Sequence, residues 1–112
     1  MKTIIYHNPR CSKSRQALQL LKEEGFEPEV IEYLKTPPGE AELKAIVAMI
    51  GGDAMALIRR KEYEELHLPD TKDQNELISR ICAHPEILQR PVVVNGNKAC
   101  LGRPPEKVLG IL

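Results

Sequence analysis

Short apolar runs and helical periodicities alternate along this chain in an order that predicts a mixed α/β fold. Residues 2–7 and 29–34 are short, strand-like runs, and Asn8-Pro9 and Thr36-Pro37 break them. Between the two runs, apolar residues recur at helical spacing over residues 12–24, and Gly25 is placed to end that helix. The first third of the chain therefore predicts a β-α-β unit.

The middle of the chain carries helical patterns only. Four helices are expected there, over residues 40–50, 54–58, 63–68 and 73–84. Gly51-Gly52 ends the first of them, and Asp53 is suited to cap the second. We therefore expect a helical insertion over roughly residues 40–88.

The last quarter of the chain predicts a hairpin and a final helix. Residues 91–94 form a continuous apolar strand, Asn95-Gly96 is a strong two-residue hairpin signal, and residues 98–101 are the returning strand. Pro104-Pro105 begins a last helix, with the apolar residues Val108, Leu109 and Ile111 expected to be buried. A β-α-β half, an insertion and a β-β-α half make one thioredoxin-like domain over residues 1–112.

Composition and charge narrow the classes of partner. Of 112 residues, 42% are hydrophobic, and 16 basic residues balance 16 acidic ones to give zero formal net charge. Nucleic acids and membrane surfaces favour a basic excess, so neither is expected as a partner. No apolar run approaches the roughly 20 residues that a transmembrane helix needs. We expect a monomeric cytoplasmic protein.

Three cysteines, at positions 11, 82 and 100, make a poor disulfide framework because their number is odd and their spacing wide. In a reducing compartment they are expected to be thiols. The three histidines show no metal-ligand spacing with them, so no metal site is expected. Cys82 is expected to be a buried apolar thiol, and Cys100 to lie in the core or at the surface, with a resolving role left open.

Candidate chemistry concentrates around Cys11, where the first strand turns into the first helix. The free N–H groups and the dipole of a helix N-terminus stabilise a thiolate, and they also hold anions. Neighbouring cations strengthen this effect, so we predict that Cys11 is a reactive nucleophile. Ser14 is placed to hydrogen-bond the thiolate. For His7, a role in the loop and a passive position are equally open.

Several arginines stand at element boundaries, namely Arg59-Arg60, Arg90 and Arg103. Two or three guanidinium groups converging on one sulfur would stabilise a bound oxyanion. Spacing alone favours the simpler interpretation, in which each of them is a solvated surface charge. The Arg90–Pro91 bond is a candidate cis peptide, although only about 5–6% of such bonds are cis.

Taken together, several motifs and their order along the chain resemble those of the glutaredoxin-coupled arsenate reductases, and the resemblance extends over residues 2–112. They are the segments 7–15 (HNPRCSKSR), 33–38 (YLKTPP), 56–59 (ALIR), 84–85 (HP), 90–94 (RPVVV) and 102–105 (GRPP). The resemblance implies a thioredoxin-like fold and a cysteine that attacks arsenate. It further implies that glutathione attacks the adduct as co-substrate, that glutaredoxin resolves the mixed product, and that no metal or organic cofactor is bound.

The same resemblance implies a role for individual residues. Cys11 would be the nucleophile, and the oxyanion-binding groups would be Arg59, Arg90 and Arg103. His7 and Ser14 would tune the thiolate, Asn8 would shape the loop, and Pro91 would be the cis proline. The segment 59–63 is shorter than is usual in the family, which leaves the first anion contact open between Arg59 and Arg60.

Two other functions compete with arsenate reduction. One is a thiol-disulfide or deglutathionylating oxidoreductase that uses the same cysteine. The other is an interaction module like the Spx transcription regulators, which share the fold and typically carry a CxxC switch. Ser14 stands where the second cysteine of that switch would be, which argues against the Spx-like role.

Overall fold

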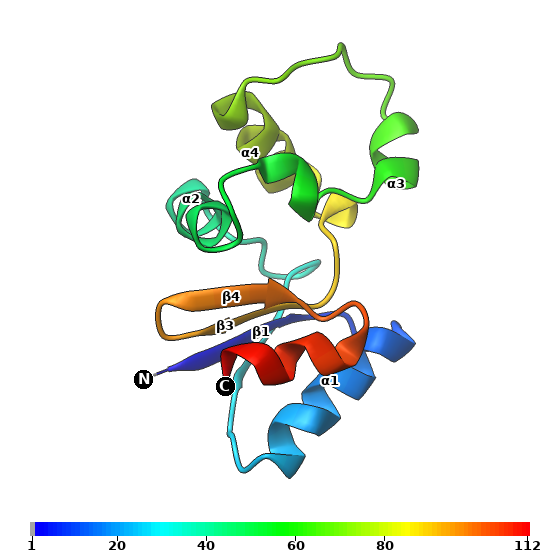
Figure 1. Cartoon of the computed structure of the whole chain (residues 1–112). Coiled ribbons are helices and arrows are strands. Elements are labelled where there is room, and N and C mark those ends of the chain that lie inside the picture. The colour runs from blue at the N-terminus through cyan, green and yellow to red at the C-terminus, as the bar shows by residue number, and fades with distance from the viewer. Residues whose placement is uncertain (1) are drawn as a thin grey trace.

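The structure is a computed structural model that describes residues 2–112 as a small sheet with helices on both faces (Figure 1). Its elements, with η marking 3₁₀ helices, are β1 (Thr3–His7), α1 (Ser12–Glu23), β2 (Glu29–Glu32), α2 (Glu40–Met49), η1 (Ala54–Leu57), α3 (Arg60–Glu64), α4 (Gln74–Ala83), η2 (Pro85–Ile87), β3 (Val92–Asn95), β4 (Lys98–Leu101) and η3 (Pro105–Ile111). This is the predicted thioredoxin-like order, with helices inserted between β2 and β3.

The sheet has four strands in the order β2-β1-β3-β4. β1 and β2 are parallel, with His7 opposite Glu32, whereas β3 runs antiparallel to both of its neighbours. Because β1 and β2 are parallel, their carboxyl ends lie at the same edge of the sheet. The chain segments that follow His7 and Glu32 therefore begin side by side.

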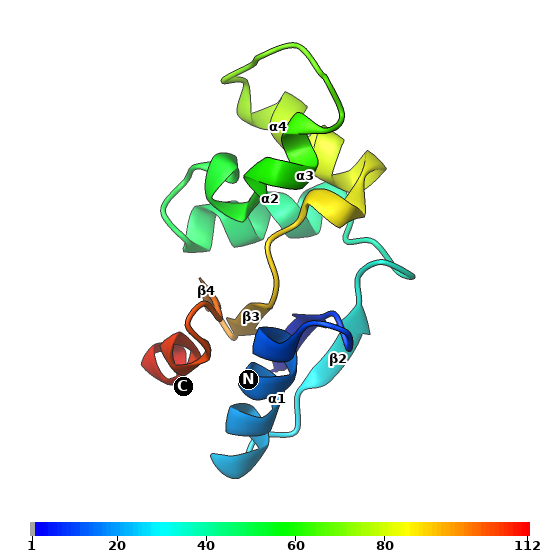
Figure 2. The ribbon, with the colours of Figure 1, turned by 90° about the vertical axis from the view of Figure 1, so that its right-hand side faces the viewer.

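The helices form separate layers on the two faces of the sheet. In Figures 1 and 2, α2, α3 and α4 lie above the sheet, and α1 with the C-terminal helix lies below it. The upper layer packs a large apolar cluster on the sheet, built around Leu43, Leu57 and Leu77, which are all fully buried. The lower layer packs a smaller cluster around Leu21 and Val108.

Helix capping agrees with the sequence patterns. The Asp53 carboxylate accepts the Met55 N–H at 3.0 Å, which fixes the start of η1. In the same way the Asp73 carboxylate accepts the Asn75 N–H at 3.0 Å at the start of α4. The insertion spans α2 to η2, close to the predicted range.

Several details differ from the sequence predictions. The second strand ends at Glu32 and not at residue 34, and Ile111 is only partly buried. The hairpin loop is Gly96-Asn97 rather than Asn95-Gly96, since Asn95 pairs with Lys98 in the ladder. The third inserted helix is α3, earlier than residues 63–68. Leu109 is not buried but 43% exposed, because the last helix is a 3₁₀ helix and its narrower turn places that side chain outward.

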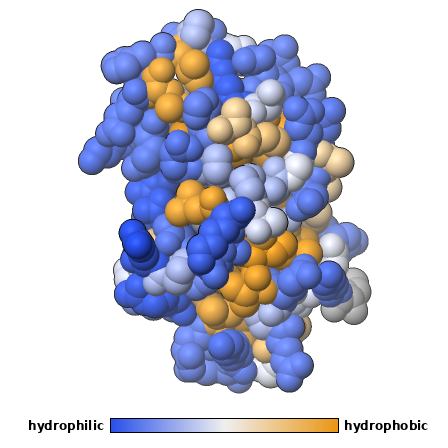
Figure 3. All heavy atoms as spheres, turned by 180° about the vertical axis from the view of Figure 1, so that it is seen from behind, coloured by the Kyte–Doolittle hydropathy of each residue, from blue (hydrophilic) through white to orange (hydrophobic). Residues whose placement is uncertain are grey.

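The face seen in Figure 3 is mostly hydrophilic, with apolar areas between the hydrophilic residues. The large apolar side chains that stand substantially exposed among the described residues are Val30, Leu34, Leu68, Leu109 and Leu112. None of the helices in residues 2–112 has the length and apolar character needed to cross a bilayer.

Candidate active site

Cys11 lies at the junction of the β1 loop with α1, as predicted. It is the N-cap residue of the helix, with φ −92° and ψ 122°, and its side chain is partly buried. The loop before it is closed by Asn8, whose backbone carbonyl accepts the Cys11 N–H at 3.0 Å. The Asn8 side-chain oxygen also accepts the Arg10 N–H at 3.0 Å. Asn8 thus holds the loop in the shape that presents the sulfur at the helix N-terminus.

The surroundings of Cys11 favour the thiolate. Partial burial on its own raises the pKa of the thiol. The backbone N–H groups of Ser14 and Lys13 and the guanidinium of Arg90 act in the opposite direction and outweigh burial, so the pKa of Cys11 is lowered. A lowered pKa increases the thiolate fraction at neutral pH, and the thiolate is the nucleophile.

Ser14 acts on the site differently from the prediction. Its backbone N–H faces the sulfur, whereas its fully buried hydroxyl lies 2.6 Å from His7 Nδ1 and accepts the Asn8 N–H at 3.1 Å. Burial lowers the pKa of His7; Glu32 opposes this shift and Arg15 adds to it, so the imidazole is neutral near pH 7. The neutral ring and the Ser14 hydroxyl share one hydrogen bond through Nδ1. The His7–Ser14 pair therefore braces the loop beneath Cys11.

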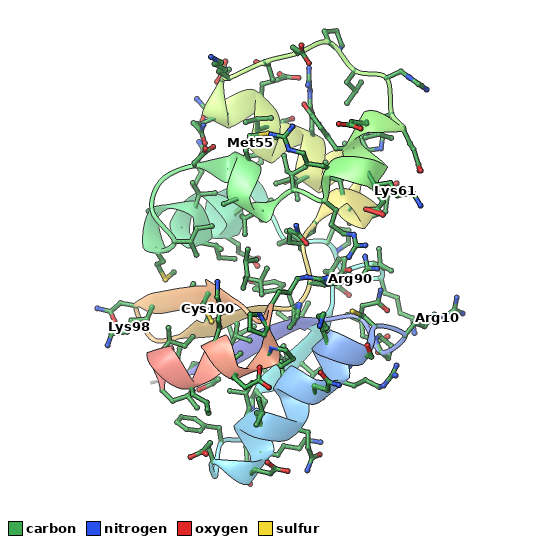
Figure 4. The ribbon with its side chains drawn as sticks, turned by 45° about the vertical axis from the view of Figure 1, so that its right-hand side comes forward. Arg10, Met55, Lys61, Arg90, Lys98 and Cys100 are labelled. Atoms are coloured by element: carbon green, nitrogen blue, oxygen red, sulfur yellow. The ribbon has the colours of Figure 1, made fainter. Side chains whose placement is uncertain are left out.

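Arg90 is the arginine that lies closest to the chemistry. It interacts with the Cys11 sulfur and neighbours Tyr33, which follows β2 at the same edge of the sheet. Figure 4 shows Arg90 at the boundary between the helical layer and the sheet, with Met55 and Lys61 well above it. The Arg90–Pro91 peptide bond is cis, and Arg103–Pro104 is cis as well, a feature not predicted from the sequence.

The other two arginines contact the surroundings of Arg90 and not Cys11 itself. Arg103 Nη1 donates to the Arg90 carbonyl at 3.3 Å. Arg59 Nε donates to Glu62 Oε2 at 2.7 Å. The Arg59 guanidinium lowers the pKa of Glu62, and Arg90 adds to this effect, so the Glu62 carboxylate senses both guanidinium groups.

Arg60, the alternative to Arg59, points elsewhere. It lines a separate pocket in the helical layer together with Met55, Tyr63 and Asp70. This pocket includes none of the residues around Cys11. Arg59, the N-cap residue of α3, does not line this pocket.

A cleft of about 520 Å³ lies beside the loop that carries Cys11. It is lined by residues 7–10 together with Glu32, Leu34, Lys35 and Arg90. Arg10, Lys35 and Arg90 give this cleft a cationic rim, and Glu32 adds one carboxylate, which pairs with Lys35 at 3.5 Å. The cleft is open to small polar molecules that carry both kinds of charge.

The remaining cysteines lie outside the site. Cys82 Sγ donates to the Pro38 carbonyl at 3.5 Å, and burial raises the pKa of its thiol. Cys100 lies on β4 on the opposite side of the molecule from Arg10 (Figure 4), and burial raises its pKa too. Both thiols are only partly buried rather than enclosed in the core. Within residues 2–112 no three His, Cys, Asp or Glu side chains are grouped to hold a metal ion.

Tyr33 lies at the site, although the sequence predicted no functional role for it. Its apolar ring suits the large cluster, so the pattern alone places it in the core. A usable signal exists nonetheless, because it directly follows a strand parallel to β1. Residues at the carboxyl ends of neighbouring parallel strands share one edge of the sheet, and Cys11 lies at that edge.

Comparison with known proteins identifies the family and the relatives that this chain resembles. The model of the ArsC family matches residues 6–111. An Escherichia coli K12 relative named "Uncharacterized protein YfgD" is 50% identical, covering 96% of this chain and 94% of its own. An arsenate reductase of Neisseria meningitidis is 46% identical to this chain, and the match covers 96% of each of the two chains.

Solved structures agree with the sequence relatives. A structure titled as an arsenate reductase from Vibrio cholerae superposes with a TM-score of 0.92 at 44% identity, covering 100% of this chain and 98% of that one. The match therefore includes the loop of Cys11, the sheet and the inserted helices together.

Proposed function

The chain belongs to the ArsC family, and from this membership we propose that it is an arsenate reductase whose nucleophile is Cys11 and whose co-substrate is glutathione. The observation that carries the proposal is the lowered pKa of Cys11, at a helix N-terminus and beside Arg90. A nucleophilic thiolate next to a fixed cation suits attack on a tetrahedral oxyanion.

Attack on arsenate brings two negative groups together. Two unit charges 4 Å apart repel by about 4 kcal/mol at an effective dielectric constant near 20, so the approach needs compensating cations. Arg90 lies at the sulfur, Arg103 adjoins the Arg90 backbone, and Arg59 pairs with Glu62, whose carboxylate Arg90 also influences. We assign these three arginines to the oxyanion, and their guanidinium donors match its oxygens.

The reaction then balances over two thiols. The Cys11 thiolate forms a sulfur–arsenic bond while one arsenate oxygen leaves as water, and arsenic remains pentavalent. Glutathione attacks this adduct, and the two electrons that reduce arsenic come from thiols that end as a disulfide. Glutaredoxin takes up the resulting mixed product, and arsenite leaves. For the whole cycle, arsenate and two thiols give arsenite, one disulfide and one water.

The cleft beside the loop supports glutathione as the co-substrate. Glutathione carries two carboxylates and one ammonium group, and the cleft offers Arg10 and Lys35 to the former and Glu32 to the latter. A molecule held there lies next to Asn8 and Arg90, which both adjoin Cys11. Its thiol would therefore reach the adduct without crossing the sheet. A thiol-dependent cycle fits a reducing cytoplasm, where the three cysteines stay free.

A coupled assay tests the proposal directly. Purified protein is supplied with arsenate, glutathione, glutaredoxin, glutathione reductase and NADPH, and NADPH consumption is followed. Wild type is expected to turn over, Cys11→Ser to lose turnover, and the matched variants Cys82→Ser and Cys100→Ser to keep it.

Two results would contradict the proposal. Arsenate-dependent turnover by Cys11→Ser would exclude this cysteine as the nucleophile. A wild-type protein that does not reduce arsenate but does reduce a glutathione–protein mixed disulfide would instead support the deglutathionylating reaction.

A further inference from the structure

Two buried side-chain polar atoms among residues 2–112 lack a hydrogen-bond partner, and both lie at the proposed active site. They are the Tyr33 hydroxyl and Arg90 Nε. The Tyr33 side chain is 0% exposed, so bulk water does not solvate its hydroxyl. Buried polar groups are nearly always paired, so two unpaired atoms in one place indicate a binding position.

The fold explains how Tyr33 reaches this place. It comes directly after β2, and the last pair between β1 and β2 is His7 with Glu32. Tyr33 therefore enters the site at the edge from which the Cys11 loop starts. Its hydroxyl neighbours the Arg90 guanidinium and the Asn8 side chain, yet its oxygen makes no well-formed hydrogen bond to either. Burial raises the pKa of Tyr33, so the hydroxyl keeps its proton.

The other two tyrosines show what a structural hydroxyl looks like in this protein. The Tyr6 hydroxyl donates to Glu42 Oε2 at 2.9 Å, and the Tyr63 hydroxyl accepts from Arg80 Nη1 at 2.6 Å. Only the Tyr33 hydroxyl is buried without such a partner. A phenylalanine would fill the same space without the cost of an unpaired hydroxyl, so packing does not account for this oxygen.

We propose that the Tyr33 hydroxyl, together with the Nε–H of Arg90, donates a hydrogen bond to an oxygen of the tetrahedral oxyanion bound at Cys11. Tyr33 is then a substrate-binding residue in addition to the three arginines. The inference rests on the proposed arsenate reductase function. An arsenate oxygen is a charged acceptor, so it would satisfy both unpaired donors at once.

The test compares Tyr33→Phe with the matched control Tyr6→Phe. For each protein, kcat/KM for arsenate is measured in the coupled assay, and the melting temperature is measured without arsenate. Tyr33→Phe is expected to lower kcat/KM about ten- to a hundredfold, the effect of losing a hydrogen bond to a charged group. Its melting temperature should equal or exceed that of wild type, because no protein hydrogen bond is lost.

Tyr6→Phe should show the reverse pattern. It removes the hydrogen bond to Glu42, so the melting temperature should fall, while kcat/KM stays within about twofold of wild type. Loss of activity without loss of stability thus separates a ligand-binding hydroxyl from a structural one.

The possible failures are distinguishable. If wild type reduces arsenate and Tyr33→Phe does so equally well, the Tyr33 inference is wrong and the proposed function stands. A lower melting temperature for Tyr33→Phe would reveal a structural partner and would also overturn the inference.

If wild type does not reduce arsenate, the proposed function fails. Protection of Cys11 from iodoacetamide by arsenate then decides the inference. Weaker protection in Tyr33→Phe supports it, and equal protection, or none in wild type, overturns it.

Discussion

Replacing Ser14 by alanine removes the brace beneath the nucleophile while leaving the backbone N–H that faces the sulfur. The hydroxyl is fully buried, lies 2.6 Å from His7 Nδ1 and accepts the Asn8 N–H at 3.1 Å. Each lost hydrogen bond costs about 0.5–1.5 kcal/mol, and the better helix propensity of alanine returns about 0.5 kcal/mol. With two hydrogen bonds lost, the expected net loss of unfolding free energy is therefore about 0.5–2.5 kcal/mol.

Urea denaturation measures this loss as a lower midpoint with an unchanged slope. Ser12→Ala is the matched control, since Ser12 begins the same helix but is exposed, and it should stay within about 0.5 kcal/mol of wild type. A Ser14→Ala variant as stable as Ser12→Ala would refute the assigned role of the hydroxyl.

The same variant tests how the thiolate is stabilised. The contact that lowers the pKa of Cys11 comes from the Ser14 backbone, which alanine retains. The midpoint pH of iodoacetamide alkylation should therefore remain low in Ser14→Ala. A midpoint near that of an ordinary cysteine would show that the hydroxyl, and not the N–H, acts on the sulfur.

Three further variants test other contacts. Arg90→Met should raise the pKa of Cys11, so the alkylation midpoint moves to higher pH, because a cation that favours the thiolate is lost. The pKa of His7 is lowered from 6.5 in the folded protein, so below pH 6.5 the unfolded chain binds more protons than the folded chain does. The free energy of unfolding should therefore decrease as the pH falls below 6.5. His7→Gln should make this decrease smaller. Gly102→Ala should cost about 1–3 kcal/mol in urea denaturation, because the added Cβ would lie 2.7 Å from the Pro91 ring.

Each of these variants has a control or a result that counts against it. Arg60→Met loses the same charge outside the site and should leave the alkylation midpoint unchanged. An unfolding free energy that stays constant below pH 6.5 would mean that His7 is not held neutral. Gly39→Ala, whose added Cβ would lie 4.0 Å from Glu42 Oε1, should be far milder than Gly102→Ala.

The parts of the site that are local in the chain were predictable from the sequence, and the parts that depend on packing were not. The Cys11 loop could be located because a strand, a break and a helix start follow one another within a few residues. The different surroundings of Arg59 and Arg60 depend on where α3 begins, and the pattern of so short a helix does not reveal that position.

Long-range contacts account for the remaining differences. The hairpin loop shifts by one residue because Asn95 stays in the ladder, and its side chain pairs with Thr3 Oγ1 and the Ile111 carbonyl. The missing partner of the Tyr33 hydroxyl is likewise a property of the packed structure. Local periodicity carries no information about either contact.

The insertion begins and ends at the site: Tyr33 stands just before it and Arg90 just after it. The nucleophile belongs to the β1–α1 loop, whereas Arg59 belongs to the inserted helices and Tyr33 and Arg90 flank them. Under the proposed function, natural selection can therefore change the inserted segment, and with it Arg59, while the loop that carries the thiol keeps its sequence. Substrate preference and the nucleophile are then able to evolve independently.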